Sequence, residues 1–246
     1  MCIVQKYGGS SLGDTGRIFR AAGRVAELVR QGHKLVVVVS AQGDTTDILL
    51  QQVSQITDAP NPRELDSFLS TGEQMSAALM AMALHKSGIN AISLTGAQAG
   101  LLTDKNHGDA KIDTLCTHRI RRELNRGNVV VVAGFQGVAP NGDITTLGRG
   151  GSDTTAVALA AYLKADKCMI YTDVDGVYDC DPRKFPQAVK FDRIDYDTML
   201  TLARQGAQVL HDRCVELAKE HGVCIQVLSS FRPGEGTLVM DGLSPN

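Results

Sequence analysis

The chain has 246 residues, of which 43% are hydrophobic and 21% charged, and its formal net charge is −2. This balance is typical of a globular protein with a substantial core, and the 4% aromatic content gives no support for a nucleic-acid surface. The six cysteines form no C-x-x-C pair and no zinc-like spacing. No apolar run approaches a membrane span, and the chain turns polar too soon for a signal sequence. We expect a reduced, cytoplasmic protein without nucleic-acid or membrane partners.

Apolar patterning predicts alternating strands and helices along the whole chain. In the first half these are a strand at 2–6, a helix at 16–30 capped by Asp14 or Thr15, a strand at 34–40, a helix after 47, two helical segments after a break at 60–62, the second covering 72–85, and a strand at 91–94. In the second half they are a helix at 112–126, a strand at 129–133, a hairpin at 140–143, a helix ending near 163, a strand at 167–171, helices at 196–204 and 213–221, and a last strand at 223–228. Continuous β-branched runs between helices are typical of a parallel sheet covered on both faces. The fold class we predict is α/β, a three-layer αβα sandwich around a mostly parallel sheet.

The segment 145–155 is the most informative stretch of the sequence. Glycines at 148, 150 and 151 lead into Ser152 and Asp153 and then into a helix-prone apolar run. Glycine lets backbone N–H groups approach an oxyanion, and a helix N-terminus adds unpaired donors. A loop that only caps the helix, through Ser152 or Asp153, is the alternative. However, a plain cap needs neither Arg149 nor so much glycine, so the stretch favours an anion site.

The loops that follow the predicted strands carry residues suited to phosphate. In an open parallel sheet these loops share the carboxyl edge, where ligands bind. The residues are Lys6, Gly8, Gly9, Ser10, Ser40, Thr46, Gly134, Thr172 and Asp173. Glycines, hydroxyls and cations collected at one edge predict a phosphate-binding site.

Four segments together resemble the amino-acid kinase family, and within it the aspartate kinases. They are KYGGSS at 6–11, STGEQ at 70–74, GRGGSD at 148–153 and TDVDGVY at 172–178. Further matching pieces lie at 43–47, 93–96, 133–137 and 229–231. The resemblance therefore covers the chain from about residue 2 to 231 in the family's order. It implies ATP-dependent phosphorylation of the side-chain carboxylate of L-aspartate to 4-phospho-L-aspartate, the first step toward lysine, threonine and methionine.

The resemblance also assigns roles to residues around the amino acid. Lys6 matches the lysine that neutralises charge on the transferring phosphoryl group, and Asp153 matches the catalytic aspartate. Arg149 matches the arginine that grips the substrate's α-carboxylate, and Glu73 matches the carboxylate that receives its α-ammonium. Taken alone, Ser70 or Thr71 with Glu73 is only a capping arrangement. The residues implied to line the aspartate and phosphate sites are Ser40, Thr46 and Ser152.

For the nucleotide, the resemblance implies two groups of residues. Backbone donors and the lysine come from the first loop, and further contacts come from the loop after residue 171. These residues are Lys6, Gly8, Gly9, Ser10, Thr172, Asp173, Tyr178 and Arg183. The acidic run 173–181 lacks the glutamate and spacing of an EF-hand, so we expect no protein-held metal; Mg²⁺ is expected to arrive with ATP.

The resemblance implies a catalytic domain at 1–232, with an amino-acid lobe at about 1–145 and a nucleotide lobe at about 146–232, followed by a tail at 233–246. The resemblance implies that relatives usually continue into paired ACT domains. The sequence stops at Asn246, and two alternatives stay open: a piece cut at the catalytic boundary, or a natural short form without built-in feedback. Two residues depart from the family pattern: Gln208 stands in place of a lysine near the phosphates, and Asp212 in place of a proline. Two alternative functions stay open: a weakly active subunit that needs a separate ACT-domain regulatory partner, and a kinase for another acid. A homodimer is a possible oligomeric state.

Overall fold

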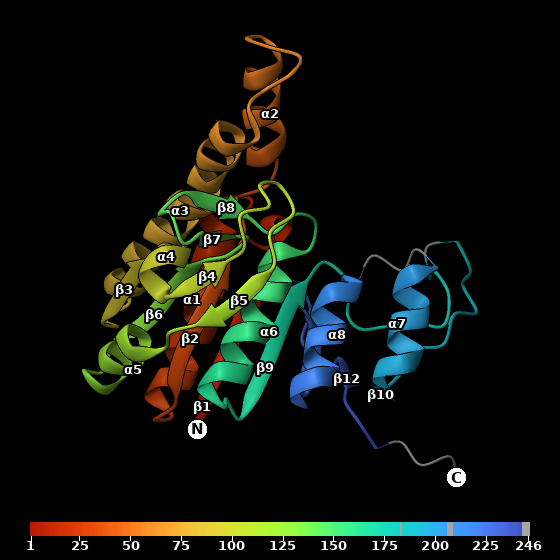
Figure 1. Cartoon of the computed structure of the whole chain (residues 1–246). Helices are drawn as coiled ribbons and strands as arrows, with labels where there is room; N and C mark the ends of the chain where they lie inside the picture. The colour runs from red at the N-terminus through yellow and green to blue at the C-terminus, as the bar shows by residue number, and fades with distance from the viewer. Residues whose placement is uncertain (183, 206–208, 243–246) are drawn as a thin grey trace.

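A computed structural model describes residues 1–182, 184–205 and 209–242 (Figure 1). Its strands are β1 (Cys2–Tyr7), β2 (Lys34–Val39), β3 (Ala91–Leu94), β4 (Leu101–Thr103), β5 (Ile112–Leu115), β6 (Val129–Ala133), β7 (Gln136–Val138), β8 (Ile144–Thr146), β9 (Lys167–Thr172), β10 (Arg193–Ile194), β11 (Ile225–Ser229) and β12 (Thr237–Val239). Its helices are α1 (Thr15–Arg30), α2 (Thr45–Ser54), α3 (Pro62–Lys86), α4 (Gly96–Ala99), α5 (His118–Asn125), α6 (Gly151–Leu163), α7 (Tyr196–Arg204) and α8 (Asp212–His221), with a short 3₁₀ helix η1 (Gly9–Leu12).

The central sheet has eight strands in the order β10-β12-β11-β9-β1-β2-β6-β3. The six from β11 to β3 are parallel to their neighbours, whereas β12 runs antiparallel to β11. The inner strands β2 and β6 are valine-rich and buried throughout apart from Lys34, as expected for parallel strands covered on both faces. β1 lies at the centre of this parallel set, between β2 and β9.

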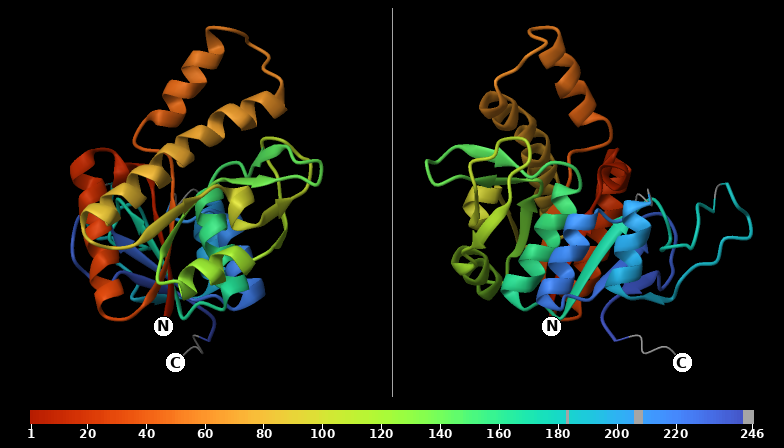
Figure 2. Two further views of the ribbon diagram at one scale, coloured as in Figure 1. Left: turned by 90° about the vertical axis from the view of Figure 1, so that its left-hand side faces the viewer. Right: turned by 45° about the vertical axis from the view of Figure 1, so that its right-hand side comes forward.

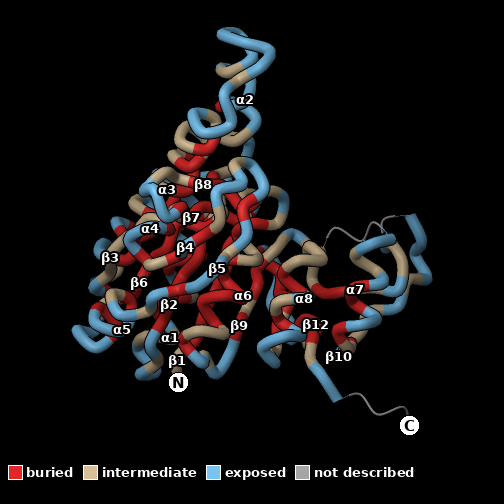
Figure 3. The backbone as a smooth tube through the Cα atoms, in the orientation of Figure 1, coloured by how far each residue is buried: buried red, intermediate tan, exposed pale blue. Residues whose placement is uncertain are grey.

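Side chains of each inner strand alternate between two apolar cores, one on each face of the sheet. In β2, Leu35, Val37 and Val39 pack in the core covered by α1 and α3. Val36 and Val38 pack in the core covered by helices that include α6 and α8. Figure 2 shows the sheet between these two helical layers, and Figure 3 shows buried residues concentrated in it. The predicted three-layer αβα sandwich is confirmed.

A second sheet of four short strands, in the order β5-β4-β7-β8, lies beside α3 (Figure 1). The predicted hairpin at 140–143 joins its strands β7 and β8, which pair antiparallel. Above it, α2 and the start of α3 project away from the body (Figure 1). Most of α2 is exposed.

The prediction of two helical segments after residue 62 was wrong, because α3 is continuous from Pro62 to Lys86. Gly72 lies in its middle without ending it. A Cβ at Gly72 would stand only 2.9 Å from the Cβ of Ala41. The glycine therefore permits close packing of α3 against the loop after β2. The hydroxyls of Ser70 and Thr71 bond back to carbonyls three residues earlier instead of capping a helix.

Other boundaries also differ from the sequence prediction. Residues 112–115 form strand β5 and not a first helical turn, because Ile112 and Leu115 pair with β4. The last strand is β12, inside the expected tail, and not β11. At the start of α6 the cap is Gly150 in the left-handed conformation, and no side chain caps this helix. Among the described residues no helix is long and apolar enough to cross a membrane.

Candidate active site

The loops after β1, β2, β6, β9 and β11 meet at the carboxyl edge of the central sheet. Hydrogen bonds to a neighbouring strand hold four of these loops there, those after β1, β2, β6 and β11: Gly8 N to Tyr171 O (3.3 Å), Ser40 N to Tyr7 O (3.1 Å), Gly134 N to Val39 O (3.0 Å) and Ser230 N to Thr172 O (2.8 Å). The edge therefore brings together most of the residues predicted to bind phosphate.

An ion pair between Lys6 and Asp153 lies at the centre of this edge. Lys6 is on the same face of β1 as Val4, which packs against α6, so its side chain extends toward the first turn of that helix. Lys6 Nζ lies 2.6 Å from Asp153 Oδ1, and both side chains are almost buried, 11% and 13% exposed. A Cβ on Gly8 would lie 3.5 Å from the same Nζ. The lysine ammonium is thus held next to the glycine loop that follows its own strand.

The glycine turn before α6 has the geometry of an anion-binding loop. Gly148 and Gly150 adopt φ of 71° and 69°, a region that favours glycine. Arg149, between them, is exposed at the edge. Ser152 is buried in the first turn of α6 and lies against Gly134, where a Cβ would come within 2.7 Å of its Oγ. The free N–H groups of this helix start and Arg149 provide donors for an anion.

Glu73 lies on α3, only 5% exposed. Its Oε1 accepts a 3.0 Å hydrogen bond from Ala41 N, directly after Ser40, whereas its buried Oε2 has no hydrogen-bond partner. Burial raises the pKa of this carboxyl to about 7. A buried carboxylate oxygen without a donor is costly, and a cationic group of a ligand is a suitable partner for it.

The first glycine loop is packed against the loop after β2. A Cβ on Gly9 would stand 2.7 Å from Ala41 O, and Gly43 N donates to Gly9 O at 3.0 Å. Ser10 is exposed in η1, and its carbonyl accepts a 2.6 Å bond from Arg17. Ser40 and Thr46, both half-buried, flank this contact, and Thr46 lies in the first turn of α2.

The loop predicted to bind nucleotide starts at the end of β9. Thr172 Oγ1 donates to Asp173 Oδ1 at 3.0 Å, and the hydroxyl of Tyr178 donates to Asp175 Oδ1 at 3.0 Å. Arg183 and Gln208 lie outside the described residues. In the part of the chain that the structure describes, no group of three or more His, Cys, Asp or Glu side chains could hold a metal ion.

Two contacts at the edge were missed by the sequence reasoning. The buried hydroxyls of Ser11 and Ser230 hydrogen-bond at 2.5 Å and join the first loop to the loop after β11. The available signal was Ser230, which directly follows β11. His211 packs over Gly150, where a Cβ would clash with its ring, and its Nδ1 lies 2.7 Å from Asp212 Oδ1. No sequence signal connects His211 with that turn, because the contact is long-range.

The sequence matches the Amino acid kinase family over residues 1–229. The chain therefore belongs to the amino-acid kinase family.

Individual relatives are similar over nearly the whole chain. The aspartokinase of Geobacillus stearothermophilus is 56% identical over 242 residues, which is 98% of this chain and 60% of that protein. The aspartate kinase structure from Synechocystis has a TM-score of 0.87 at 48% identity, over 98% of this chain and 40% of that one. The structure of E. coli aspartokinase III in complex with aspartate and ADP has a TM-score of 0.90 at 27% identity, over 100% of this chain and 66% of that one. The chain spans about 60% of the length of the first of these relatives.

Proposed function

We propose that the chain catalyses transfer of the γ-phosphoryl group of ATP to the side-chain carboxylate of L-aspartate, giving 4-phospho-L-aspartate and ADP. Its 56% identity with an aspartokinase and its likeness to an aspartokinase structure holding aspartate and ADP support this proposal. The observation that carries it is the buried Glu73, whose unpaired oxygen lies on a helix that borders the edge carrying the Lys6–Asp153 pair. Such a site suits an acceptor that also has an ammonium group.

The chemical step needs positioning and charge stabilisation more than covalent help. A side-chain oxygen of aspartate forms a bond to the γ-phosphorus, and the bond from phosphorus to the β,γ-bridging oxygen breaks, leaving the electron pair on ADP. Lys6 neutralises charge on the transferring group, and Asp153 holds Lys6 in place at 2.6 Å. No general base is required, because the attacking carboxylate is already ionised near neutral pH.

The rest of the substrate is recognised by groups of opposite charge. Glu73 binds the α-ammonium and Arg149 the α-carboxylate, for which a planar guanidinium gives bidentate geometry. Ser40, Thr46 and Ser152 line the space between these charges. A kinase for carbamate or UMP does not need both Glu73 and Arg149, which favours an amino acid with a free α-amino group.

The nucleotide is proposed to lie against the first glycine loop and the loop after β9. Gly8, Gly9 and Ser10 offer backbone donors to phosphate oxygens, and Thr172, Asp173 and Tyr178 contact the adenosine part together with Arg183. Mg²⁺ bound to ATP supplies charge neutralisation on the phosphates. The ion is expected to come with ATP and to keep several waters.

The remaining predictions concern the setting of the reaction. We expect it in the cytoplasm, at the start of the route to lysine, threonine and methionine. The division into an amino-acid lobe at 1–145 and a nucleotide lobe at 146–232 is part of the proposal. Association as a homodimer, or with a separate ACT-domain subunit, is a further expectation that size measurement of the purified chain with and without such a subunit tests.

The first experiment is ADP release from Mg-ATP with and without L-aspartate, with hydroxylamine present to trap the acyl phosphate as its hydroxamate. Hydroxamate that depends on aspartate supports the proposal. A panel with glutamate, N-acetylglutamate, carbamate and UMP as acceptors is the control, and faster turnover of any of them contradicts it. ATP binding without turnover of any acceptor favours the subunit that needs a regulatory partner.

A further inference from the structure

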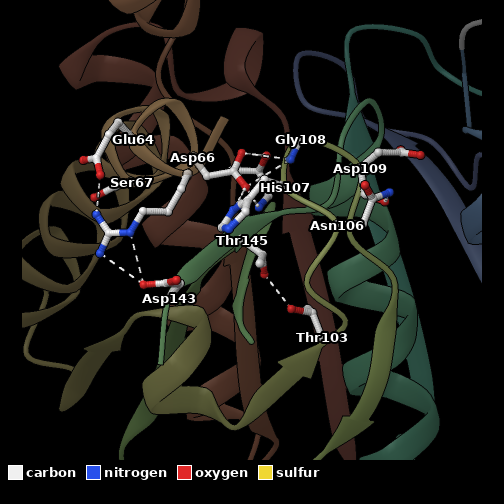
Figure 4. Close-up of polar contacts among 12 residues, drawn as sticks. Glu64, Asp66, Ser67, Thr103, Asn106, His107, Gly108, Asp109, Asp143 and Thr145 are labelled. Carbon is white, nitrogen blue, oxygen red and sulfur yellow. Dashed lines mark hydrogen bonds and ion pairs between the residues drawn. The ribbon is translucent and has the colours of Figure 1, made fainter. Parts of the chain in front are cut away.

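A second buried carboxylate, Asp66, lies on α3 away from the Lys6–Asp153 pair. Its side chain is 1% exposed, and it accepts hydrogen bonds from four donors (Figure 4). These are His107 Nδ1 (2.9 Å), Gly108 N (3.0 Å), Thr146 N (3.0 Å) and Thr146 Oγ1 (2.6 Å). A buried carboxylate with this many donors is fixed in position, because each lost bond leaves an unpaired buried group.

The donors to Asp66 come from two segments that are separate in sequence. His107 and Gly108 belong to the loop between β4 and β5, whereas Thr146 is the last residue of β8. One carboxylate thus fastens α3 to both a loop and a strand of the smaller sheet. Figure 4 shows Asp66 pointing into this junction, with His107 and Gly108 directed toward it.

The two segments that Asp66 fastens lead directly to the proposed aspartate site. Asp66 and Glu73 are seven residues apart on α3, which places them on one face of the helix about 10 Å apart along its axis. On the other side, Thr146 precedes Arg149 by three residues. A Cβ on Gly148 would lie 2.9 Å from Asp109 Oδ1 and 3.2 Å from Gly108 O, so the turn bearing Arg149 also rests on the loop that Asp66 holds.

A second side chain, Arg213, fixes the turn 147–150 from another helix. Arg213, on α8, donates to Leu147 O at 3.0 Å and to Asp109 Oδ1 at 2.5 Å. The loop 104–110 and the turn 147–150 are therefore fixed between α3 and α8. Neither Asp66 nor Arg213 is needed for the chemistry of phosphoryl transfer as described above.

We propose that Asp66 is a positioning residue that sets the spacing between Glu73 and Arg149, and so determines the affinity for the amino acid substrate. This rests on the proposed function, in which Glu73 binds the α-ammonium and Arg149 the α-carboxylate. A substrate held at two charged points binds well only if those points stand at a fixed separation. Asp66 supplies that separation by fastening the element that carries one point to the element that leads to the other.

Two adjacent threonines of β8 provide a matched test. Thr146→Val removes the hydroxyl that donates to Asp66 but keeps the backbone donors of Thr146 and Gly108. Thr145→Val removes an equally buried hydroxyl that bonds to Thr103, away from Asp66. We expect Thr146→Val to raise KM for aspartate about fivefold, with KM for ATP and kcat within about twofold of the parent. Thr145→Val is expected to lower the melting temperature comparably and to leave both KM values unchanged.

Asp66→Asn gives the larger effect, because an amide replaces one acceptor oxygen by a donor. We expect KM for aspartate to rise at least about tenfold while KM for ATP stays constant. If both threonine variants change KM for aspartate equally, or if neither does, the positioning role is overturned, whether or not Asp66→Asn folds. Absence of aspartate phosphorylation by the unmodified chain overturns the proposed function instead, so the two failures are distinguishable.

Discussion

The proposed amino-acid side and the proposed nucleotide side of the edge are built differently. On the first, the polar side chains of α3 and β8 are buried and bonded across elements, as Asp66 and Thr146 are. On the second, the loop after β9 is largely exposed (Figure 3), and its polar groups bond mostly within the loop, as Tyr178 does to Asp175. The difference is that Asp66 and Thr146 fix the proposed amino-acid side by bonds between elements, whereas the proposed nucleotide loop is anchored mainly through Val177, which packs in the core and donates from its N–H to Thr237. Substitutions on the first side should therefore act on KM for aspartate, and those on the second on KM for ATP.

The largest effect is expected where the two sides meet, at the Lys6–Asp153 pair. Lys6→Ala and Asp153→Ala should each lower kcat about 10²- to 10³-fold, because each removes charge stabilisation of the transferring phosphoryl group. The control is Lys34→Ala on the neighbouring strand, where the ammonium bonds to Asn125. Steady-state kinetics with both substrates measure the effect. Unchanged turnover in the Asp153 variant contradicts the site.

A pH dependence on the amino-acid side should follow from Glu73. Burial raises the pKa of Glu73 to about 7, and only its ionised form attracts the substrate ammonium. KM for aspartate should therefore rise as the pH falls below about 7, approaching tenfold per pH unit, and level off above that value. The pKa of Glu73 in the folded state exceeds its unfolded value of about 4.3. Glu73 therefore contributes to the free energy of unfolding in full below pH about 4.3, and this contribution is lost as the pH rises to about 7.

Glu73→Gln is the variant that isolates this pH dependence. It should raise KM for aspartate about 10- to 100-fold at pH 8 and remove the dependence between pH 6 and 8. KM for ATP over the same pH range serves as the internal control. A profile that is unchanged in Glu73→Gln means that another group titrates.

Alanine substitutions at two helix glycines distinguish the effect of close packing on stability from the effect of helix propensity. Gly72→Ala places a Cβ 2.9 Å from that of Ala41, whose N–H holds Glu73, whereas Gly23 in α1 has no atom within 4 Å of the added Cβ. We expect Gly72→Ala to destabilise the fold by about 1–3 kcal/mol and to raise KM for aspartate a few-fold. Gly23→Ala should stabilise by about 0.5–1 kcal/mol without a kinetic effect. Thermal melts and kinetics check both, and equal stabilisation by the two variants refutes the packing argument.

The smallest effect is expected on the nucleotide side. Tyr178→Phe removes the hydroxyl that donates to Asp175 at 3.0 Å, one bond within a partly exposed loop. KM for ATP should rise about two- to threefold while KM for aspartate stays constant. Tyr196→Phe, whose hydroxyl bonds to Val223 O away from the edge, is the control. A change in KM for aspartate in Tyr178→Phe breaks the division between the two sides.

The parts of the fold that could be predicted from sequence are those set by local pattern. The valine runs of β2 and β6 predict strands buried on both faces, because the runs are short, apolar throughout and β-branched. Asp14 was one of two expected caps of α1, and it accepts from Arg17 N at 2.8 Å. The helix boundary predicted at Gly72 was wrong, since a glycine inside a helix resembles a boundary unless its packing against Ala41 is known.

The candidate site likewise has residues that could be predicted from the sequence and residues that could not. Lys6, Arg149 and Asp153 stand in motifs, and Lys6 meets Asp153 because α6 packs on the face of β1 that also carries Val4. Asp66 has a visible relation to Glu73, seven residues along one helix face, yet nothing local indicates that His107 and Thr146 converge on it. Such convergence depends on the register of the smaller sheet, whose short strands have little pattern of their own.

The central place of β1 has a consequence for the synthesis of the protein. β1 pairs with β2 early in the chain but also with β9, and α6 covers the face that carries Val4 and Val36. At about 5–20 residues per second, translation leaves that apolar face bare for on the order of ten seconds after β2 emerges from the ribosome. Nascent chains that end before α6 therefore expose that face to chaperones and to one another, and Lys6 meets Asp153 only when the second half of the molecule arrives.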